Sequence, residues 1–176
     1  MRKFTWSIFV LLAVALLAPS AYAKRDKKLK ETSKEAIEIL KDSDSKLEEW
    51  FKDAYGYVIF PNVGKAGFGI GGAFGKGEVY EKGRFIGEAR LTQGSIGFQW
   101  GGQMYCEVIF FEKEANLENF TKSKFTLSAQ ASAVVAAEGA AANAKYEHGV
   151  AVFTVAKGGV MYEASVGGQK FKYIEK

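Results

Sequence analysis

Apolar residues between positions 31 and 54 recur every three or four residues, which is the period of one helix face. The residues of this stripe are Ala36, Ile37, Leu40, Leu47, Trp50, Phe51 and Ala54. Two capping-box pairs mark helix starts, Thr32 with Glu35 and Ser45 with Glu48. The pattern therefore predicts two short helices, separated by a break near 42–44, that pack on a core through one shared stripe.

After Tyr55 the period changes to two and glycine becomes frequent, as in strands joined by tight turns. The stretch "EKGR" (81–84) is a candidate hairpin turn. Positions 112–123 interrupt the alternation and predict a short helix that buries Ala115, Leu117 and Phe120. The small and polar stretch 138–149 predicts a loop. We therefore expect an α+β fold: a mainly antiparallel sheet or barrel with an N-terminal helical pair and one short internal helix.

The stretch "GKAGFGIGG" contains Gly67, Gly69 and Gly72 in the spacing of a dinucleotide-binding fingerprint. That fingerprint requires a helix directly after the glycines, because the helix N-terminus receives the pyrophosphate. Here the chain continues with alternation and more glycine up to the turn at 81–84. We therefore expect a strand at this place and no nucleotide cofactor.

Alternation suggests another use for the glycines. One strand would place Gly67, Gly69 and Gly71 on the face opposite its bulky residues, and a second would do the same with Gly97 and Gly101. Such a bare face permits strong bending and close packing of another element, which is the interpretation we favour. A cleft for a lipid chain or headgroup is the functional alternative.

The first 23 residues have the features of a secretory signal peptide. A basic start precedes an apolar run over 8–17, and the stretch ends in Ala21-Tyr22-Ala23. The run is shorter than the ~20 residues that span a bilayer. We expect cleavage after Ala23 and a protein of the periplasm or the extracellular space, including the peripheral surface of a membrane.

Charge is unevenly distributed in the remaining chain. Removing Arg2 and Lys3 from the 24 basic residues leaves 22 against 20 acidic ones. Positions 24–30, "KRDKKLK", hold five of these positive charges and one negative charge, so the rest is slightly acidic. This distribution predicts a short basic arm on a body that has no affinity for nucleic acid.

The residues that usually carry catalysis or metal are scarce. Cys106 is the only cysteine, so an internal disulfide is excluded, and it lies in the strand-like run "MYCEVIFF", which indicates a buried thiol. His148 is the only histidine and lies beside a glycine, as turn residues do. We therefore expect neither a metal site nor an enzyme, and no cofactor.

Longer motifs resemble a known family. "AYGYVIFPNVGKAGFGIGGAFGKG", "LTQGSIGFQWGGQMYCEVIFF", "AQASAV" and "KGGVMYEASVGGQKFKY" are similar to the SYLF-domain family of lipid-binding proteins and actin regulators. The resemblance runs from about 36 to 173. It implies a single β-rich domain over 31–176 with helices packed on it. It also implies binding of membrane lipid, phosphoinositide in eukaryotic members, often through a basic segment just before the domain.

The resemblance assigns the basic segment as the lipid-binding part. Its residues are Lys24, Arg25, Lys27, Lys28 and Lys30. Lys65 and Lys76 flank the glycine-rich stretch and are further candidates for phosphate contact. Candidates for insertion into lipid are Trp50, Phe51, Phe68, Phe74 and Trp100, although most of these would serve the core.

Two functions remain open from the sequence. A protein outside the cytoplasm meets anionic phospholipid rather than phosphoinositide or actin, so we expect a non-catalytic envelope protein that binds anionic lipid. The alternative is a protein-interaction module of the envelope, resembling the actin-binding relatives, without lipid specificity.

Overall fold

The structure is a computed structural model that describes residues 25–68, 70–96, 102–122, 125–128, 132–157 and 164–176. Within them the chain forms the following helices and strands in order: α1 (Lys27–Ser43), α2 (Leu47–Asp53), β1 (Gly56–Phe68), β2 (Ile70–Glu81), β3 (Arg84–Ile96), β4 (Gly102–Phe111), α3 (Glu114–Thr121), β5 (Ser132–Val135), α4 (Ala140–Asn143), β6 (Val150–Ala156), β7 (Ala164–Ser165) and β8 (Lys170–Glu175). The α+β class predicted from the sequence is confirmed.

The strands form one open sheet in the order β7-β5-β6-β4-β1-β2-β3-β8. Its described ladders are antiparallel except that β5 runs parallel to β6. The strands do not close into a barrel, which was the other architecture that the alternation allowed. The predicted turn at 81–84 is confirmed, since Lys82 and Gly83 have φ values of 47° and 75° between β2 and β3.

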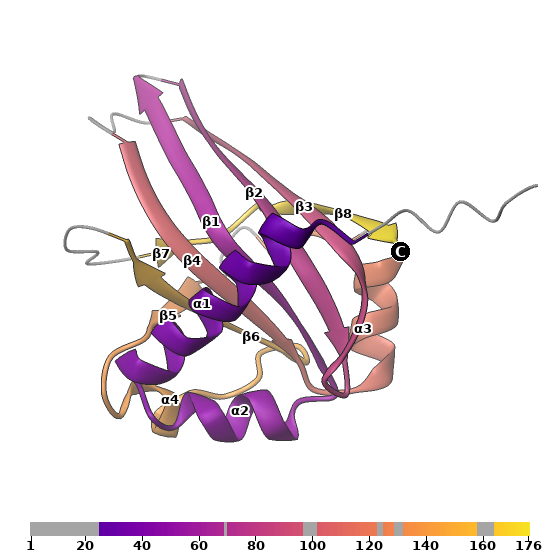
Figure 1. The fold of residues 1–176 in the computed structure, drawn as a ribbon. Helices are drawn as coiled ribbons and strands as arrows, with labels where there is room; N and C mark the ends of the chain where they lie inside the picture. Colours follow the sequence, from indigo (N-terminus) through magenta and orange to yellow (C-terminus); the bar gives the residue numbers. More distant parts are fainter. Residues whose placement is uncertain (1–24, 69, 97–101, 123–124, 129–131, 158–163) are drawn as a thin grey trace, which may run out of the picture.

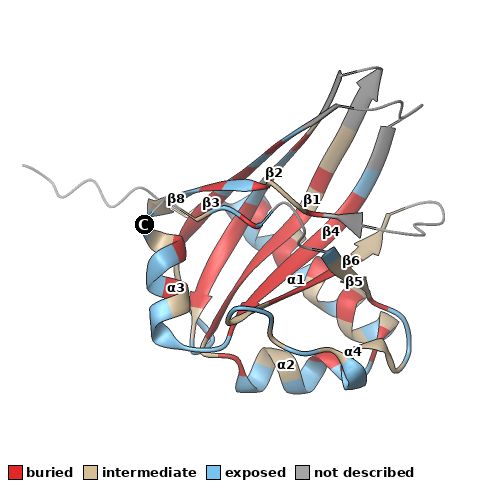
Figure 2. Ribbon diagram, turned by 180° about the vertical axis from the view of Figure 1, so that it is seen from behind, coloured by how far each residue is buried: buried red, intermediate tan, exposed pale blue. Residues whose placement is uncertain are grey.

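Both faces of the sheet are covered, so the two central strands are buried on both sides. On the face that we call the helix-side face, α1 lies across the sheet and α2 lies at its lower end (Figure 1). Their apolar stripe packs on alternate strand residues to form the helix-side core, which includes Ala36, Leu40, Leu47, Tyr57, Ile59, Val108, Phe110 and Phe153. Figure 2 shows these buried positions along the middle of β1, β4 and β6.

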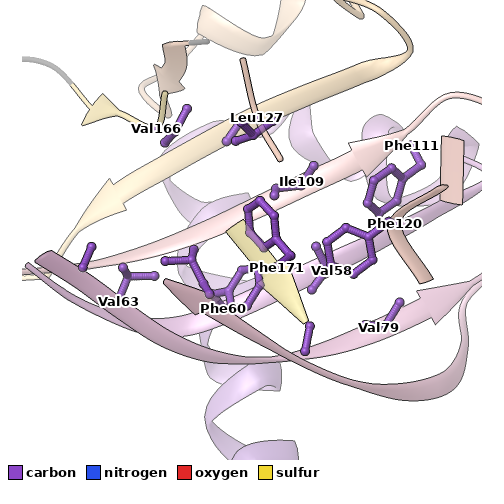
Figure 3. Close-up of a cluster of buried hydrophobic side chains, with 14 of the residues drawn as sticks. Val58, Phe60, Val63, Val79, Ile109, Phe111, Phe120, Leu127, Val166 and Phe171 are labelled. Atoms are coloured by element: carbon purple, nitrogen blue, oxygen red, sulfur yellow. The ribbon is translucent and has the colours of Figure 1, made fainter. Parts of the chain in front are cut away.

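The residues between them point to the opposite face and form a second core, closed by α3 and β8 (Figure 3). It includes Val58, Phe60, Val79, Leu91, Ile109, Phe111, Phe120 and Phe171. Burying one such apolar side chain contributes about 1.5–3 kcal/mol, so the two cores account for the stability of a chain without a disulfide.

The helical pair is confirmed, but its caps differ from the prediction. Helix α1 begins at Lys27 rather than after Thr32. The Asp26 carboxylate caps it, because it accepts hydrogen bonds from the backbone N–H groups of Lys28 and Leu29. From residue 25 onward the predicted basic arm is therefore part of the folded domain. The predicted break is present, yet Ser45 does not cap α2; the buried Asp44 carboxylate accepts from the Lys46 N–H instead.

Three smaller predictions have mixed outcomes. The internal helix buries Leu117 and Phe120 as expected, whereas Ala115 is exposed. The predicted loop 138–149 contains the short helix α4. Cys106 is fully buried, and His148 lies in a turn with a φ of 51°; both were predicted.

The glycine-rich stretch is a hairpin rather than one strand. Phe68 at the end of β1 pairs with Ile70 at the start of β2, and Gly67 pairs with Gly71. The single strand predicted for 67–72 is therefore wrong, because the chain reverses direction within it. The pairing nevertheless keeps Gly67 with Gly71 on one face, as predicted. Strand β2 does follow the glycines, where a nucleotide fingerprint needs a helix.

Candidate functional site

A row of basic residues crosses three strands on the helix-side face. Lys76 of β2 is paired with Arg90 of β3, and Arg90 is paired with Lys172 of β8. Paired residues of neighbouring strands point to the same face, so three cations stand side by side. All three side chains are exposed. We call Lys76, Arg90 and Lys172 the basic row.

The basic row does not stabilise the sheet. Like charges directly opposite each other on neighbouring strands are destabilising. Lys76 has one acidic neighbour, since its Nζ lies 3.5 Å from Oδ2 of Asp26. No carboxylate of the described residues forms an ion pair with Arg90 or Lys172. Such a row is suited to a partner that brings negative charge.

The nearest acidic residues on this face already have partners. Glu78 and Glu88 are paired with each other, two positions from Lys76 on β2 and two positions from Arg90 on β3. The Glu78 carboxylate is held by Arg25, and an oxygen of Glu88 lies 3.5 Å from Nζ of Lys176. Neither carboxylate is thus free to neutralise the basic row.

Arg25, predicted as a lipid-binding residue, is instead committed to the fold. Its Nε and Nη2 donate to the two carboxylate oxygens of Glu78 at 2.6 and 2.7 Å, and Nη2 also donates to the Tyr80 hydroxyl at 2.7 Å. Its guanidinium lies 4.0 Å from the centre of the Phe85 ring. These contacts anchor the start of α1 to the sheet, and the hydrogen bond to Glu78 also raises the pKa of Arg25.

Lys27, Lys28 and Lys30 are exposed on the first turns of α1. Successive helix positions differ by 100°, so the three side chains point in different directions around the helix axis. Positive charges near a helix N-terminus interact unfavourably with the helix dipole, so these lysines do not stabilise α1. The start of α1 lies beside the basic row, because Asp26 caps the helix and contacts Lys76. Lys24 lies outside the described residues.

Lys65 and Lys76 do not form one site, although both flank the glycine-rich stretch in the sequence. Lys65 is paired with Ala73, which belongs to the second core. Lys76 points to the helix-side face with the rest of the basic row. Lys76 is three positions from Ala73 on β2, and an odd offset along a strand reverses the face. The Lys65 and Lys76 side chains therefore lie on opposite faces of the sheet.

Next to the basic row is a row of different character. Met104, Gly64, Phe74, Thr92 and Lys170 are paired in succession across β4, β1, β2, β3 and β8. Among the described residues, Phe74 and Met104 are the exposed large hydrophobic side chains, at 67% and 46%. We call this pair the apolar pair. Beyond α1 the upper ends of β1 and β2 project without a helix over them (Figure 1).

Glycines lie beneath the apolar pair. A Cβ added to Gly64 would meet Sδ of Met104 at 3.5 Å, and one added to Gly72 would meet the Phe74 ring at 3.3 Å. A Cβ on Gly94, which is paired with Gly72, would meet nothing within 4 Å. The two exposed side chains therefore lie on nearly bare backbone.

The predicted glycine strands are only partly described. Gly67 and Gly71 face each other near the hairpin end, while Gly69, Gly97 and Gly101 lie outside the described residues, as does Trp100. Of the other insertion candidates, Trp50 and Phe51 pack in the helix-side core.

Other chemistry has little support in the described part of the chain. No group of three or more His, Cys, Asp and Glu residues there could hold a metal ion. Burial raises the pKa of the Cys106 thiol, which disfavours a thiolate nucleophile. No helix of the described residues is long and apolar enough to cross a membrane.

Sequence reasoning missed Arg90, Lys170 and Lys172. A signal was present, because Lys170 and Lys172 are two positions apart in a strand-like stretch and so share a face. Their position beside Arg90 and Lys76 depends on strand order and register, which the alternation does not specify.

Comparison with known proteins shows what the chain is similar to. Residues 92–173 match the family model described as Las17-binding protein actin regulator. Over 136 residues the chain is 29% identical to the Beta cell expansion factor A of Aeromonas veronii. This alignment covers 72% of the chain and 48% of that relative, so the chain spans about half of its length. The resemblance to the SYLF-domain family that was drawn from the motifs is therefore confirmed over residues 92–173, the part of the chain that matches the family model.

Proposed function

We propose that this protein binds anionic membrane lipid without catalysis, through the basic row and the exposed start of α1. The observation that carries the proposal is the pairing of Lys76, Arg90 and Lys172 in one exposed row. Such a row costs folding free energy unless negative charge is brought to it. The SYLF resemblance, which implies lipid binding, supports the same conclusion.

The electrostatics suit an extended anionic surface rather than one small anion. Each Lys or Arg near an anionic bilayer contributes about 1 kcal/mol, and the effect decays within a Debye length of about 10 Å. Lys27, Lys28 and Lys30 fan out around α1, and the basic row follows the sheet beside them. Phosphate groups spread over a membrane match this arrangement better than a single phosphate does.

The second candidate is a protein-interaction module. The family description, an actin regulator that binds the protein Las17, favours it. An acidic protein surface would also complement the basic row. We rank it second, because the exposed apolar side chains of Phe74 and Met104 on the same face suit the apolar layer of a bilayer.

The place of action is part of the proposal. The N-terminal 23 residues have the pattern of a cleaved leader, which supports a protein of the periplasm or the extracellular side. In a cell envelope, anionic phospholipid is the membrane lipid that carries the negative charge which the basic row would bind.

Vesicle co-sedimentation of residues 24–176 tests the proposal. Anionic vesicles of phosphatidylglycerol and phosphatidylcholine are compared with neutral phosphatidylcholine vesicles, at low and moderate salt. We expect binding to the anionic vesicles only, weakening as salt increases. The double variant Arg90→Gln with Lys172→Gln should bind on the order of 30-fold more weakly at low salt.

A matched control carries the same loss of charge elsewhere. Lys52 on α2 and Lys145 after α4 are exposed and lie outside the basic row, so Lys52→Gln with Lys145→Gln should bind as the parent does. Equal losses in both double variants would indicate nonspecific charge attraction. Absence of binding at any salt would reject the lipid proposal and turn attention to an envelope protein partner.

A further inference from the structure

We infer that Phe74 and Met104 enter the apolar layer of the membrane when the basic row contacts its headgroups. This inference rests on the proposed function and specifies which part of the molecule penetrates the lipid. It assigns insertion to the uncovered end of the sheet and not to α1.

Exposure and position single out the apolar pair. Phe74 is 67% exposed and Met104 is 46% exposed, and among the residues that the structure describes they are the exposed large hydrophobic side chains. The pair flanks Gly64 in one cross-strand row, so both side chains point to the same face. Two neighbouring exposed apolar side chains on one face indicate a contact surface rather than scattered surface hydrophobicity.

Positively charged side chains lie beside the apolar pair, at the level where lipid headgroups would be if the pair entered the apolar layer. Phe74 and Lys76 are two residues apart on the same face of β2, a separation of about 7 Å. Lysine can place its aliphatic stem in the apolar layer while its amine reaches the headgroups. On the other side of Met104, the Lys157 amine lies 3.0 Å from Oδ1 of Asn62. The apolar pair thus has cations beside it where headgroups would lie.

The surroundings of the pair favour lipid over a protein partner. Gly64, Gly72 and Gly94 leave the backbone bare around the two side chains, and Thr92 is the polar side chain paired with Phe74. This part of the face thus offers few polar side chains with which to recognise a defined polypeptide. Insertion into a fluid acyl layer does not require a complementary pocket. Two exposed apolar side chains that project from a glycine-rich surface are sufficient for it.

Helix α1 is not free to supply the inserted surface. Its apolar positions Leu29, Ala36 and Leu40 are buried against the sheet. Its start is held by the pairing of Arg25 with Glu78, whose carboxylate is fully buried. The sheet end needs no such rearrangement, because the apolar pair is already exposed.

Site-specific fluorescence tests insertion directly. Phe74→Cys is labelled with nitrobenzoxadiazole, and the buried Cys106 does not compete for the label in the folded protein. With vesicles of phosphatidylglycerol and phosphatidylcholine, we expect its emission to shift to shorter wavelength and to increase. The same label on Lys52→Cys, on the exposed side of α2, should not respond.

Partitioning of two further variants provides an independent measurement. Phe74→Ser combined with Met104→Ser should lower the vesicle partition coefficient at least tenfold, roughly equally at low and moderate salt, because apolar transfer is not screened. Phe74→Leu keeps an apolar side chain and should bind within about threefold of the parent. Both positions are exposed, so the fold should be retained, which circular dichroism verifies.

The outcomes separate this inference from the proposed function. If the parent protein does not bind vesicles, both fail. If it binds while the label at position 74 stays unchanged, or the serine variant binds as the parent does, the inference is overturned and charge-driven binding stands. A shift of the label that requires only higher protein concentration, without vesicles, would assign the apolar pair to contact between two copies of the chain and would also overturn it.

Discussion

The Arg25 guanidinium donates to both carboxylate oxygens of Glu78, across 53 residues of sequence, at 2.6 and 2.7 Å. The Glu78 side chain is fully buried, whereas Arg25 is 27% exposed. Arg25 thus supplies the positive charge that makes this buried carboxylate tolerable, and it fixes the start of α1 at the same time.

Removing Arg25 should therefore destabilise the protein more than removing an ordinary surface arginine. Arg25→Ala leaves the Glu78 charge buried without its partner, and we expect a loss of roughly 3 kcal/mol in the free energy of unfolding. Urea denaturation measures it. Arg84→Ala is the control, because Arg84 is 79% exposed and contacts Glu81 only at 3.5 Å, and it should change stability by less than about 0.5 kcal/mol. Equal effects of the two substitutions would contradict the anchoring role.

Glu107 predicts a dependence of stability on pH. It is fully buried on β4, accepts one hydrogen bond from Nε2 of Gln169 at 3.0 Å, and burial raises its pKa to about 7 from 4.5. The folded protein thus holds a neutral carboxyl group where the unfolded chain is ionised. Stability should fall as pH rises from about 4.5 to about 7, by up to roughly 3 kcal/mol, and then level off.

Glu107→Gln should remove this part of the pH dependence, because the amide keeps an acceptor for Gln169 and cannot ionise. Thermal unfolding of the variant and the parent at pH 5 and pH 8 makes the comparison. The variant should gain stability relative to the parent at pH 8 and be close to it at pH 5. Parallel curves for the two proteins would show that Glu107 is ionised when folded.

Two glycines should respond oppositely to alanine. A Cβ on Gly77 would lie 2.6 Å from both the Ile59 carbonyl oxygen and the Phe60 ring, so Gly77→Ala must displace a buried strand and should cost about 1–3 kcal/mol. Gly94 has open space around its Cβ position, and Gly94→Ala should be neutral or stabilising by less than about 1 kcal/mol. Chemical denaturation of both variants checks the contrast, and a Gly77→Ala protein as stable as the parent would refute the close approach.

The Cys106 thiol should be unreactive until the protein unfolds. It is fully buried and burial raises its pKa, so the thiolate is neither formed nor accessible. Reaction with Ellman's reagent should be slow in buffer and rapid and complete in concentrated urea. Fast labelling in buffer would mean that the strand opens locally, and it would also require a Cys106→Ser background for the fluorescence experiment.

Much of the fold follows from local pattern. The stripe through Leu40 and Leu47, the alternation through Val58 and Phe110, and the turn at Lys82 each depend on neighbours in the sequence, and all three were predicted correctly. The helix caps were harder to predict, because Thr32 and Asp26 both belong to the residue types that commonly cap helices. The choice of Asp26 follows from Arg25, whose partner Glu78 is distant in the sequence.

The candidate site was predicted less completely, since it depends on register. Lys65 and Lys76 flank the same glycines in the sequence, yet the hairpin sends them to opposite faces. Arg90 lies beside Lys76 through the register of β2 and β3, and Lys172 joins them only because β8 returns to pair with β3. Alternation tells which residues share a face of one strand, but not which strands stand next to each other.

Phe110 and Phe111 are consecutive on β4 but belong to different cores, the first to the helix-side core and the second to the core beneath α3 and β8. The backbone of one sheet therefore separates two apolar cores, which we call two compartments. Loosening either compartment would wet one side of the same strand and weaken the pairing on which the other depends. Fluorine labels on these two adjacent rings would report on compartments that are separate in space, and their signals should be lost in a single concerted transition.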